Sequence, residues 1–177
     1  MKSHLPNLIT IARLAALPFA ASALLLGDQP LTLALVGFIA LSDWLDGFLA
    51  RRWNAQSAFG AAMDPIADKL TQFTLLALLA FGGRPEFGAI PPWLAGLVFA
   101  RELILVYGAL RIRGRKGNVT IQPRWEGKLS TLLIFVLLLI ALLSVPQPWI
   151  DVLAWVTAPL VVLSTIQYWR AGMAQVR

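Results

Sequence analysis

Six apolar stretches, each about 20 residues long, constrain the fold of this chain more than any other feature. They run from Leu5 to Leu26, Leu31 to Arg51, Ala58 to Phe81, Trp93 to Ile112, Glu126 to Val145 and Trp149 to Trp169. A helix of this length crosses the hydrocarbon core of a bilayer. The mean hydropathy of +0.72 is also well above that of water-soluble domains. The sequence therefore predicts an all-α polytopic membrane protein with six transmembrane helices, in which residues 1–177 form a single domain.

The charges at the ends of these stretches predict the orientation in the membrane. One set of ends carries Lys2, Arg51, Arg52, Arg111, Arg113, Arg115, Lys116, Arg124, Lys128, Arg170 and Arg177. The other set carries Asp28, Arg84, Glu86 and Asp151. By the positive-inside rule, both termini, the link over 52–57 and the basic loop over 113–123 lie on the cytoplasmic side of the inner membrane. The net charge of +6 is thus explained by topology and anionic lipid head groups, and no nucleic-acid partner is expected.

Four of the nine acidic residues lie in the hairpin formed by the second and third stretches. They are Asp43, Asp46, Asp64 and Asp68. The first two are spaced i, i+3 and the last two i, i+4, so each pair shares one helix face. A turn near position 55 sets Asp46 level with Asp64 and Asp43 level with Asp68. Because ionised carboxylates near hydrocarbon are costly, the sequence predicts one acidic cluster that opens toward the cytoplasm and binds a counter-charge.

The residues around the cluster predict a metal and a phosphate-bearing ligand. The chain has no cysteine, so the donors are hard carboxylate oxygens, which suit Mg²⁺ or Mn²⁺, and one or two such ions could neutralise the cluster. Mg²⁺ sites usually include phosphate oxygens as well. Gly47, Ala50 and Gly60 share the faces of the aspartates and leave room for a ligand, although small residues also permit close helix packing. Arg51 can reach a phosphate, or it can serve as an interfacial positive charge.

The same residues form a recognisable pattern, Asp43-x-x-Asp46-Gly47-x-x-Ala50-Arg51, then eight residues, then Gly60-x-x-x-Asp64-x-x-x-Asp68. At every specified position this pattern resembles the signature of the CDP-alcohol phosphatidyltransferase family. The resemblance implies a reaction in which an alcohol attacks the diacylglycerol-side phosphorus of CDP-diacylglycerol and expels CMP. It also implies a homodimer.

Residue roles follow from this resemblance. At the matching positions, Asp43, Asp46 and Asp64 are expected to bind metal. Asp68 is expected to act as the general base and as a further ligand. The resemblance assigns the nucleotide and diphosphate of the substrate to Gly47, Ala50, Arg51 and Gly60.

Two further segments resemble bacterial phosphatidylglycerophosphate synthases and CMP-forming cardiolipin synthases. They are Asp64-Pro65-Ile66-Ala67-Asp68-Lys69 and the run from Asn7 to Arg13. In those proteins the first helix borders the nucleotide-lipid site, which implies that Asn7 and Thr10 contribute to it. Arg13 could join them, although a helix-capping Asn7 and an Arg13 that snorkels to the interface are adequate alternative explanations.

Basic residues in the second half of the chain are candidates for binding the acceptor alcohol. Arg101 lies about half-way along an apolar stretch, where a charge faces an interior site or a partner. Arg111 and Lys128 flank the basic loop. Glycerol 3-phosphate is the preferred acceptor. The alternative is phosphatidylglycerol, because Arg111 is shifted from the position expected for glycerophosphate users.

The alternative function that is not enzymatic is a divalent-cation transporter or channel, since intramembrane carboxylates often line ion paths. Such sites commonly lie near the middle of the membrane, between repeats. Here the carboxylates are predicted near the cytoplasmic side, and small residues that leave room for phosphate accompany them. The sequence therefore favours the enzyme.

Overall fold

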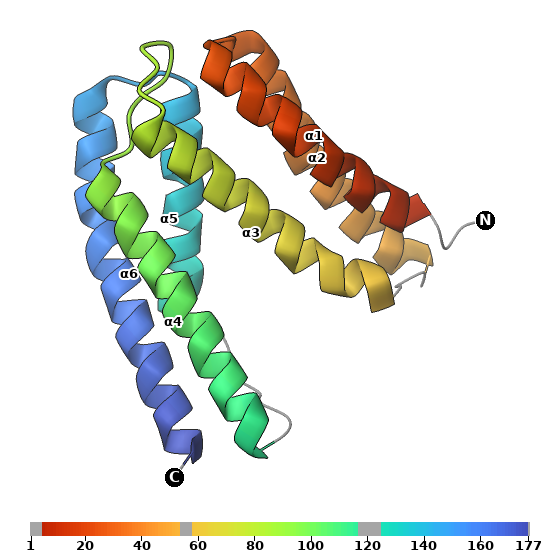
Figure 1. Cartoon of the computed structure of the whole chain (residues 1–177), viewed down its shortest axis with the longest axis vertical. Helices are drawn as coiled ribbons and strands as arrows, with labels where there is room; N and C mark the ends of the chain where they lie inside the picture. The colour runs from red at the N-terminus through yellow and green to blue at the C-terminus, as the bar shows by residue number, and fades with distance from the viewer. Residues whose placement is uncertain (1–4, 54–57, 117–124, 177) are drawn as a thin grey trace. The chain divides into compact units, whose positions relative to one another are not determined.

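The computed structural model describes the backbone over residues 5–53, 58–116 and 125–176. It describes the side-chain surroundings over residues 9–43, 45, 63–108 and 125–171. Within these ranges the chain is all-helical and contains no strand (Figure 1). The helices are α1 (Leu5–Leu26), α2 (Gln29–Trp53), α3 (Ala58–Phe81), α4 (Pro92–Lys116), α5 (Trp125–Leu142) and α6 (Gln147–Val176). The all-helical prediction is confirmed.

The predicted bounds of α1 and α3 agree with the structure, whereas four helices differ at their ends. α2 continues to Trp53, so the first two residues of the predicted link are helical. α4 continues to Lys116, which places Arg111 and the start of the predicted basic loop in the helix. α6 begins at Gln147 because a proline, here Pro148, is well accommodated in a first helical turn. α5 ends at Leu142, and Ser144 beyond it has a positive φ of 55°.

Three helices of the described chain are long and apolar enough to cross a membrane. The qualifying segments are Ile9–Leu26 in α1, Trp125–Leu142 in α5 and Gln147–Ala171 in α6. The apolar part of α2, Gln29–Asp43, is shorter. Charged residues lower the hydropathy of the other helices, as Asp64, Asp68 and Lys69 do in α3. The six predicted spans are thus supported for three helices by length and composition.

The first compact unit, Met1–Phe87, is organised around α1, which packs against both α2 and α3. Leu17, Ala20 and Ile39 are buried at the contact between α1 and α2. Gly27 ends α1 with a φ of 76°, a left-handed conformation that favours glycine. The amides of Gly27 and Asp28 donate to the carbonyls of Leu24 and Ala23, at 3.1 and 3.0 Å. Asp28 then caps α2 by accepting a hydrogen bond from the Leu31 amide at 3.1 Å.

The second compact unit, Gly88–Arg177, is organised around α6, which packs against α4 and α5. Gly88 donates from its amide to the Ala141 carbonyl at 2.8 Å. A Cβ on Gly88 would lie 3.2 Å from Ala141 Cα and 2.2 Å from Ile150 Cδ1, so a larger residue here would need the Ile150 side chain to move and α5 to shift slightly. Gln147, at the start of α6, accepts from the Ala89 amide at 3.0 Å and donates to its carbonyl at 2.7 Å. These contacts fasten the segment before α4 to α5 and α6.

Candidate active site

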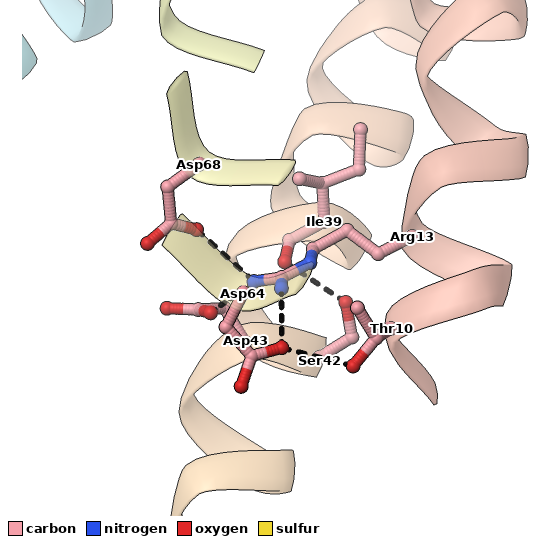
Figure 2. Close-up of polar contacts among 7 residues, drawn as sticks. All are labelled: Thr10, Arg13, Ile39, Ser42, Asp43, Asp64 and Asp68. Carbon is pink, nitrogen blue, oxygen red and sulfur yellow. Dashed lines mark hydrogen bonds and ion pairs between the residues drawn. The ribbon is translucent and has the colours of Figure 1, made fainter. Parts of the chain in front are cut away.

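Arg13 lies at the centre of the candidate site in the first unit. Thr10, Arg13 and Leu17 are spaced i, i+3 and i+7 along α1, so they lie on one face of the helix, and that face is buried. The Arg13 side chain is 1% exposed. Its Nη1 donates to Asp43 of α2 and, at 3.1 Å, to Asp68 of α3. Its Nη2 donates to Asp64 of α3 at 3.2 Å. Figure 2 shows the guanidinium among the three carboxylates.

The structure brings together three of the four predicted aspartates. Asp64 and Asp68 lie one turn apart on α3, and both form ion pairs with the guanidinium of Arg13. Asp43 and Asp68 bind the same nitrogen, in agreement with the prediction that these two residues lie level. The three aspartate side chains are between 40% and 50% exposed, in contrast to Arg13. The three carboxylates are therefore bound by a residue of α1 and still reach the surface of the unit.

Thr10 also belongs to this arrangement. Its side chain is buried, and its Oγ1 donates to Asp64 Oδ1 at 3.0 Å. Asp64 Oδ1 also accepts the hydrogen bond from Arg13 Nη2. The orientation of this carboxylate is thus fixed by two donors that stand one turn apart on α1.

The surroundings of seven predicted site residues lie outside the described side chains. They are Asn7, Asp46, Gly47, Ala50, Arg51, Gly60 and Arg111. Their backbone is helical, with Asn7 in α1, Asp46, Gly47, Ala50 and Arg51 in α2, Gly60 in α3, and Arg111 in α4.

Of the two explanations that the sequence offered for Arg13, the burial of its side chain within the unit disfavours snorkelling to the interface. A charge inside an apolar helix, on the same face as Thr10, was the signal that this residue binds something. The spacing rules relate residues on one helix or one hairpin. They do not indicate which neighbouring helices α1 packs against, and that packing supplies the three partners of Arg13.

The charges of the cluster do not balance. Three carboxylates meet one guanidinium, so these four side chains together carry two excess negative charges. Hard carboxylate oxygens in excess are the donors that Mg²⁺ and Mn²⁺ prefer, so the donor set fits a divalent cation. In the described residues, however, no group of three or more His, Cys, Asp or Glu side chains is arranged to hold a metal ion. The carboxylates of Asp43, Asp64 and Asp68 instead converge on Arg13.

In the second unit, Arg101 is paired within its own helix. Its Nη1 donates to Oε1 of the adjacent Glu102 at 3.0 Å, and the two residues are 7% and 8% exposed. A Cβ on Gly127 would lie 4.0 Å from Arg101 Nη2, so the guanidinium borders the first turn of α5. Lys128, the next residue of α5, is exposed. The structure thus brings Arg101 to the helix start that carries Lys128.

A further polar contact joins α5 to α6 in the second unit. Gln167 Nε2 donates to Glu126 Oε1 at 3.0 Å. In the described residues of this second unit, three buried side-chain atoms have no hydrogen-bond partner, namely Arg101 Nε, Glu126 Oε2 and Gln167 Oε1. Buried polar atoms without partners are uncommon and costly, and they are suited to binding a polar ligand. The sequence prediction included Arg101 but missed Glu126 and Gln167, which no local spacing connects.

Comparison with known proteins extends the similarity to nearly the whole chain. The model of the CDP-alcohol phosphatidyltransferase family matches residues 3–165. A CDP-diacylglycerol--glycerol-3-phosphate 3-phosphatidyltransferase of Salmonella choleraesuis (strain SC-B67) is 34% identical over 183 residues, covering 97% of this chain and 96% of the relative. A protein of the same name from Escherichia coli (strain K12) is 34% identical over 185 residues, covering 98% and 97%.

Proposed function

We propose that this chain, which belongs to the CDP-alcohol phosphatidyltransferase family, transfers the phosphatidyl group of CDP-diacylglycerol to glycerol 3-phosphate. The products are phosphatidylglycerophosphate and CMP. Two full-length relatives at 34% identity carry the name of this activity, which favours glycerol 3-phosphate over phosphatidylglycerol as the acceptor.

The observation that carries the proposal is the meeting of Asp43, Asp64 and Asp68 around one point of the first unit. These residues, together with Asp46, would hold two divalent cations, Mg²⁺ or Mn²⁺. Bound there, such cations would polarise phosphoryl oxygens and stabilise the leaving phosphate. The partial exposure of the three described carboxylates leaves them accessible to a diphosphate from the surface of the unit.

In the reaction, the acceptor hydroxyl oxygen forms a bond to the diacylglycerol-side phosphorus. The bond from that phosphorus to the bridging oxygen of the diphosphate breaks, and CMP leaves with the bonding electron pair. Asp68 takes the hydroxyl proton as the general base. Gly47, Ala50 and Gly60 leave space for the nucleotide and its diphosphate, and Arg51 donates to the phosphates. Asn7 and Thr10 complete the nucleotide site from α1.

The phosphate of the acceptor is bound by Arg101, Arg111 and Lys128. Support comes from the burial of Arg101 and from its Nε, which lacks a partner among the described residues. Arg101 also borders the first turn of α5, where helix amide groups favour an anion. A phosphate monoester, which carries more negative charge than the phosphodiester of phosphatidylglycerol, suits such a site.

The protein is proposed to lie in the cytoplasmic membrane as a homodimer. All six helices would span the bilayer, with both termini and the active site on the cytoplasmic side. The distribution of Lys and Arg supports this orientation. Because the family model covers most of both compact units, residues 1–177 are proposed to act as one functional domain.

The proposal is tested with the purified full-length protein in detergent micelles. CDP-diacylglycerol and Mg²⁺ are supplied with glycerol 3-phosphate or with phosphatidylglycerol, and CMP and lipid products are measured by mass spectrometry. We expect CMP and phosphatidylglycerophosphate from glycerol 3-phosphate, and no turnover after EDTA. Cardiolipin formed from phosphatidylglycerol, with no product from glycerol 3-phosphate, would overturn the acceptor assignment. Cation flux in liposomes without CMP release would overturn the enzyme itself.

A further inference from the structure

Arg13 binds the same carboxylates that the proposed function assigns to divalent cations. Its Nη1 is shared by Asp43 and Asp68, and its Nη2 is bound to Asp64. All three carboxylates are therefore engaged by one buried side chain from a third helix. None of the residues that the signature pattern specifies lies on that helix.

A guanidinium and a divalent cation compete when they bind the same oxygens. Both need lone pairs of the same carboxylate oxygens. The positive charges of the guanidinium and the cation also repel each other at short range. With the guanidinium among them, Asp43, Asp64 and Asp68 are not arranged as a group that could hold a metal ion. A cation that gathers these carboxylates must therefore weaken or break the hydrogen bonds to Arg13.

We infer that Arg13 is an internal counter-ion that competes with the divalent cations for the aspartate cluster and sets the affinity of their binding. The inference rests on the proposed function, because it takes the three aspartates as cation ligands. In this role Arg13 acts on the cations through the three carboxylates that it binds. In the absence of a cation the guanidinium holds the carboxylates of α2 and α3 together, and a bound cation takes over this task.

Competition makes a directional prediction for Arg13→Gln. The variant removes one positive charge and its hydrogen bonds from the cluster but keeps a polar side chain of similar length. We expect the dissociation constant for Mn²⁺ alone to fall by about tenfold or more, because a unit charge this close interacts strongly with the ions that it faces. Mn²⁺ binding by the full-length protein in micelles is measured by electron paramagnetic resonance, without substrate.

The matched control is Arg84→Gln. Arg84 is an exposed arginine of the same unit, and no ion pair with the described aspartates is present in the structure. This variant changes the net charge equally and leaves the cluster intact, so its dissociation constant for Mn²⁺ should match that of the wild type. An equal gain of affinity in both variants would reduce the effect to net charge and overturn the inference.

Thermal unfolding gives a second readout. In EDTA, Arg13→Gln should melt well below the wild type, because three carboxylates lose their shared partner. Saturating Mg²⁺ should remove most of that difference, since the cation replaces the guanidinium. An equal difference with and without Mg²⁺ would mean that Arg13 is only a structural ion pair. Weaker Mn²⁺ binding in the variant would mean that Arg13 preorganises the ligands and does not compete.

Arg13→Lys covers the case in which Arg13→Gln does not fold. A lysine retains the charge but lacks the planar fork that binds several carboxylates at once, so Mn²⁺ affinity should rise by a smaller factor. Unchanged affinity in this variant would contradict the inference. A wild-type protein that binds no Mn²⁺ and shows no turnover would instead overturn the proposed function. If the wild type binds Mn²⁺ and turns over but neither Arg13 variant gains affinity, only the role of Arg13 is overturned.

Discussion

Thr10 of α1 donates a hydrogen bond from Oγ1 to Oδ1 of Asp64 on α3, across a distance of 3.0 Å. The two residues are 54 positions apart in the sequence. The contact places a residue of the first helix against a proposed metal ligand, next to the hydrogen bond from Arg13 Nη2 to the same oxygen. The first helix is therefore part of the acidic site as well as a membrane segment.

Replacing Thr10 with Val keeps the shape of the side chain and removes its donor. We expect a loss of about 1 kcal/mol, because a hydrogen bond to a partly exposed carboxylate contributes about that much. This corresponds to a melting temperature lower by about 2–4 °C for a chain of this size. Turnover should fall about fivefold if Asp64 loses its orientation. Thermal unfolding and CMP release measure the two effects, and Thr10→Ser, which keeps the hydroxyl, should restore both.

Replacing Asp68 with Asn removes the proposed base. We expect CMP release to fall by about 100-fold or more, the usual contribution of a general base. Binding of CDP-diacylglycerol, measured by calorimetry, should persist. The control is Asp28→Asn, which changes an aspartate of the same unit but keeps its capping function, because Asn caps helices equally well. Full turnover of the Asp68 variant would remove this residue from the role of base.

The proposed role of Arg101 in binding the acceptor can be distinguished from its ion pair with Glu102 by a single and a double variant. Arg101→Gln alone breaks the buried ion pair with Glu102, and breaking a buried pair by removing one member destabilises a protein by about 3–5 kcal/mol. The double variant Arg101→Gln, Glu102→Gln removes both charges and should recover most of the lost melting temperature. If Arg101 binds the acceptor phosphate, the KM for glycerol 3-phosphate should stay raised by about tenfold in both variants. A double variant with wild-type KM would contradict that assignment.

Gln147 tests the attachment of the segment before α4 to α6. Its amide makes two hydrogen bonds to the backbone of Ala89 and donates to Asp151 Oδ1 at 2.9 Å. Gln147→Ala should lower the melting temperature by about 2–4 °C, the effect of losing about 1 kcal/mol. The rate per folded molecule should not change. Asp151→Asn keeps an acceptor for Gln147 and should melt closer to the wild type; slower turnover of Gln147→Ala would link this contact to the site.

The sequence was sufficient to predict that Asp43, Asp64 and Asp68 lie together, but not that Arg13 lies at their centre. Asp64 and Asp68 lie on one helix, and their i, i+4 spacing fixes their common face. Asp43 could be set level with Asp68 because a short link joins their helices. Arg13 is different, because its role depends on how α1 packs against α2 and α3, and no spacing along the chain encodes that contact.

The helix ends also differ in how well the sequence predicts them. The bounds of α1 were predictable because Gly27, in a left-handed conformation, follows its last residue. α4 was predicted too short because its last turns are rich in Arg and Lys, which form helices well but are not apolar. An apolar pattern therefore locates the part of a helix that is buried or faces lipid and misses a polar extension.

The distances along the chain between Arg13 and its partners have a consequence for biosynthesis. Its three counter-charges are synthesised 30, 51 and 55 residues later. Until then, an apolar α1 that enters the bilayer carries a cation with no fixed anion, a situation that hydrocarbon disfavours. We therefore expect the first helix to reach its final depth only after the third has left the ribosome, so that insertion and assembly of the acidic site are one event.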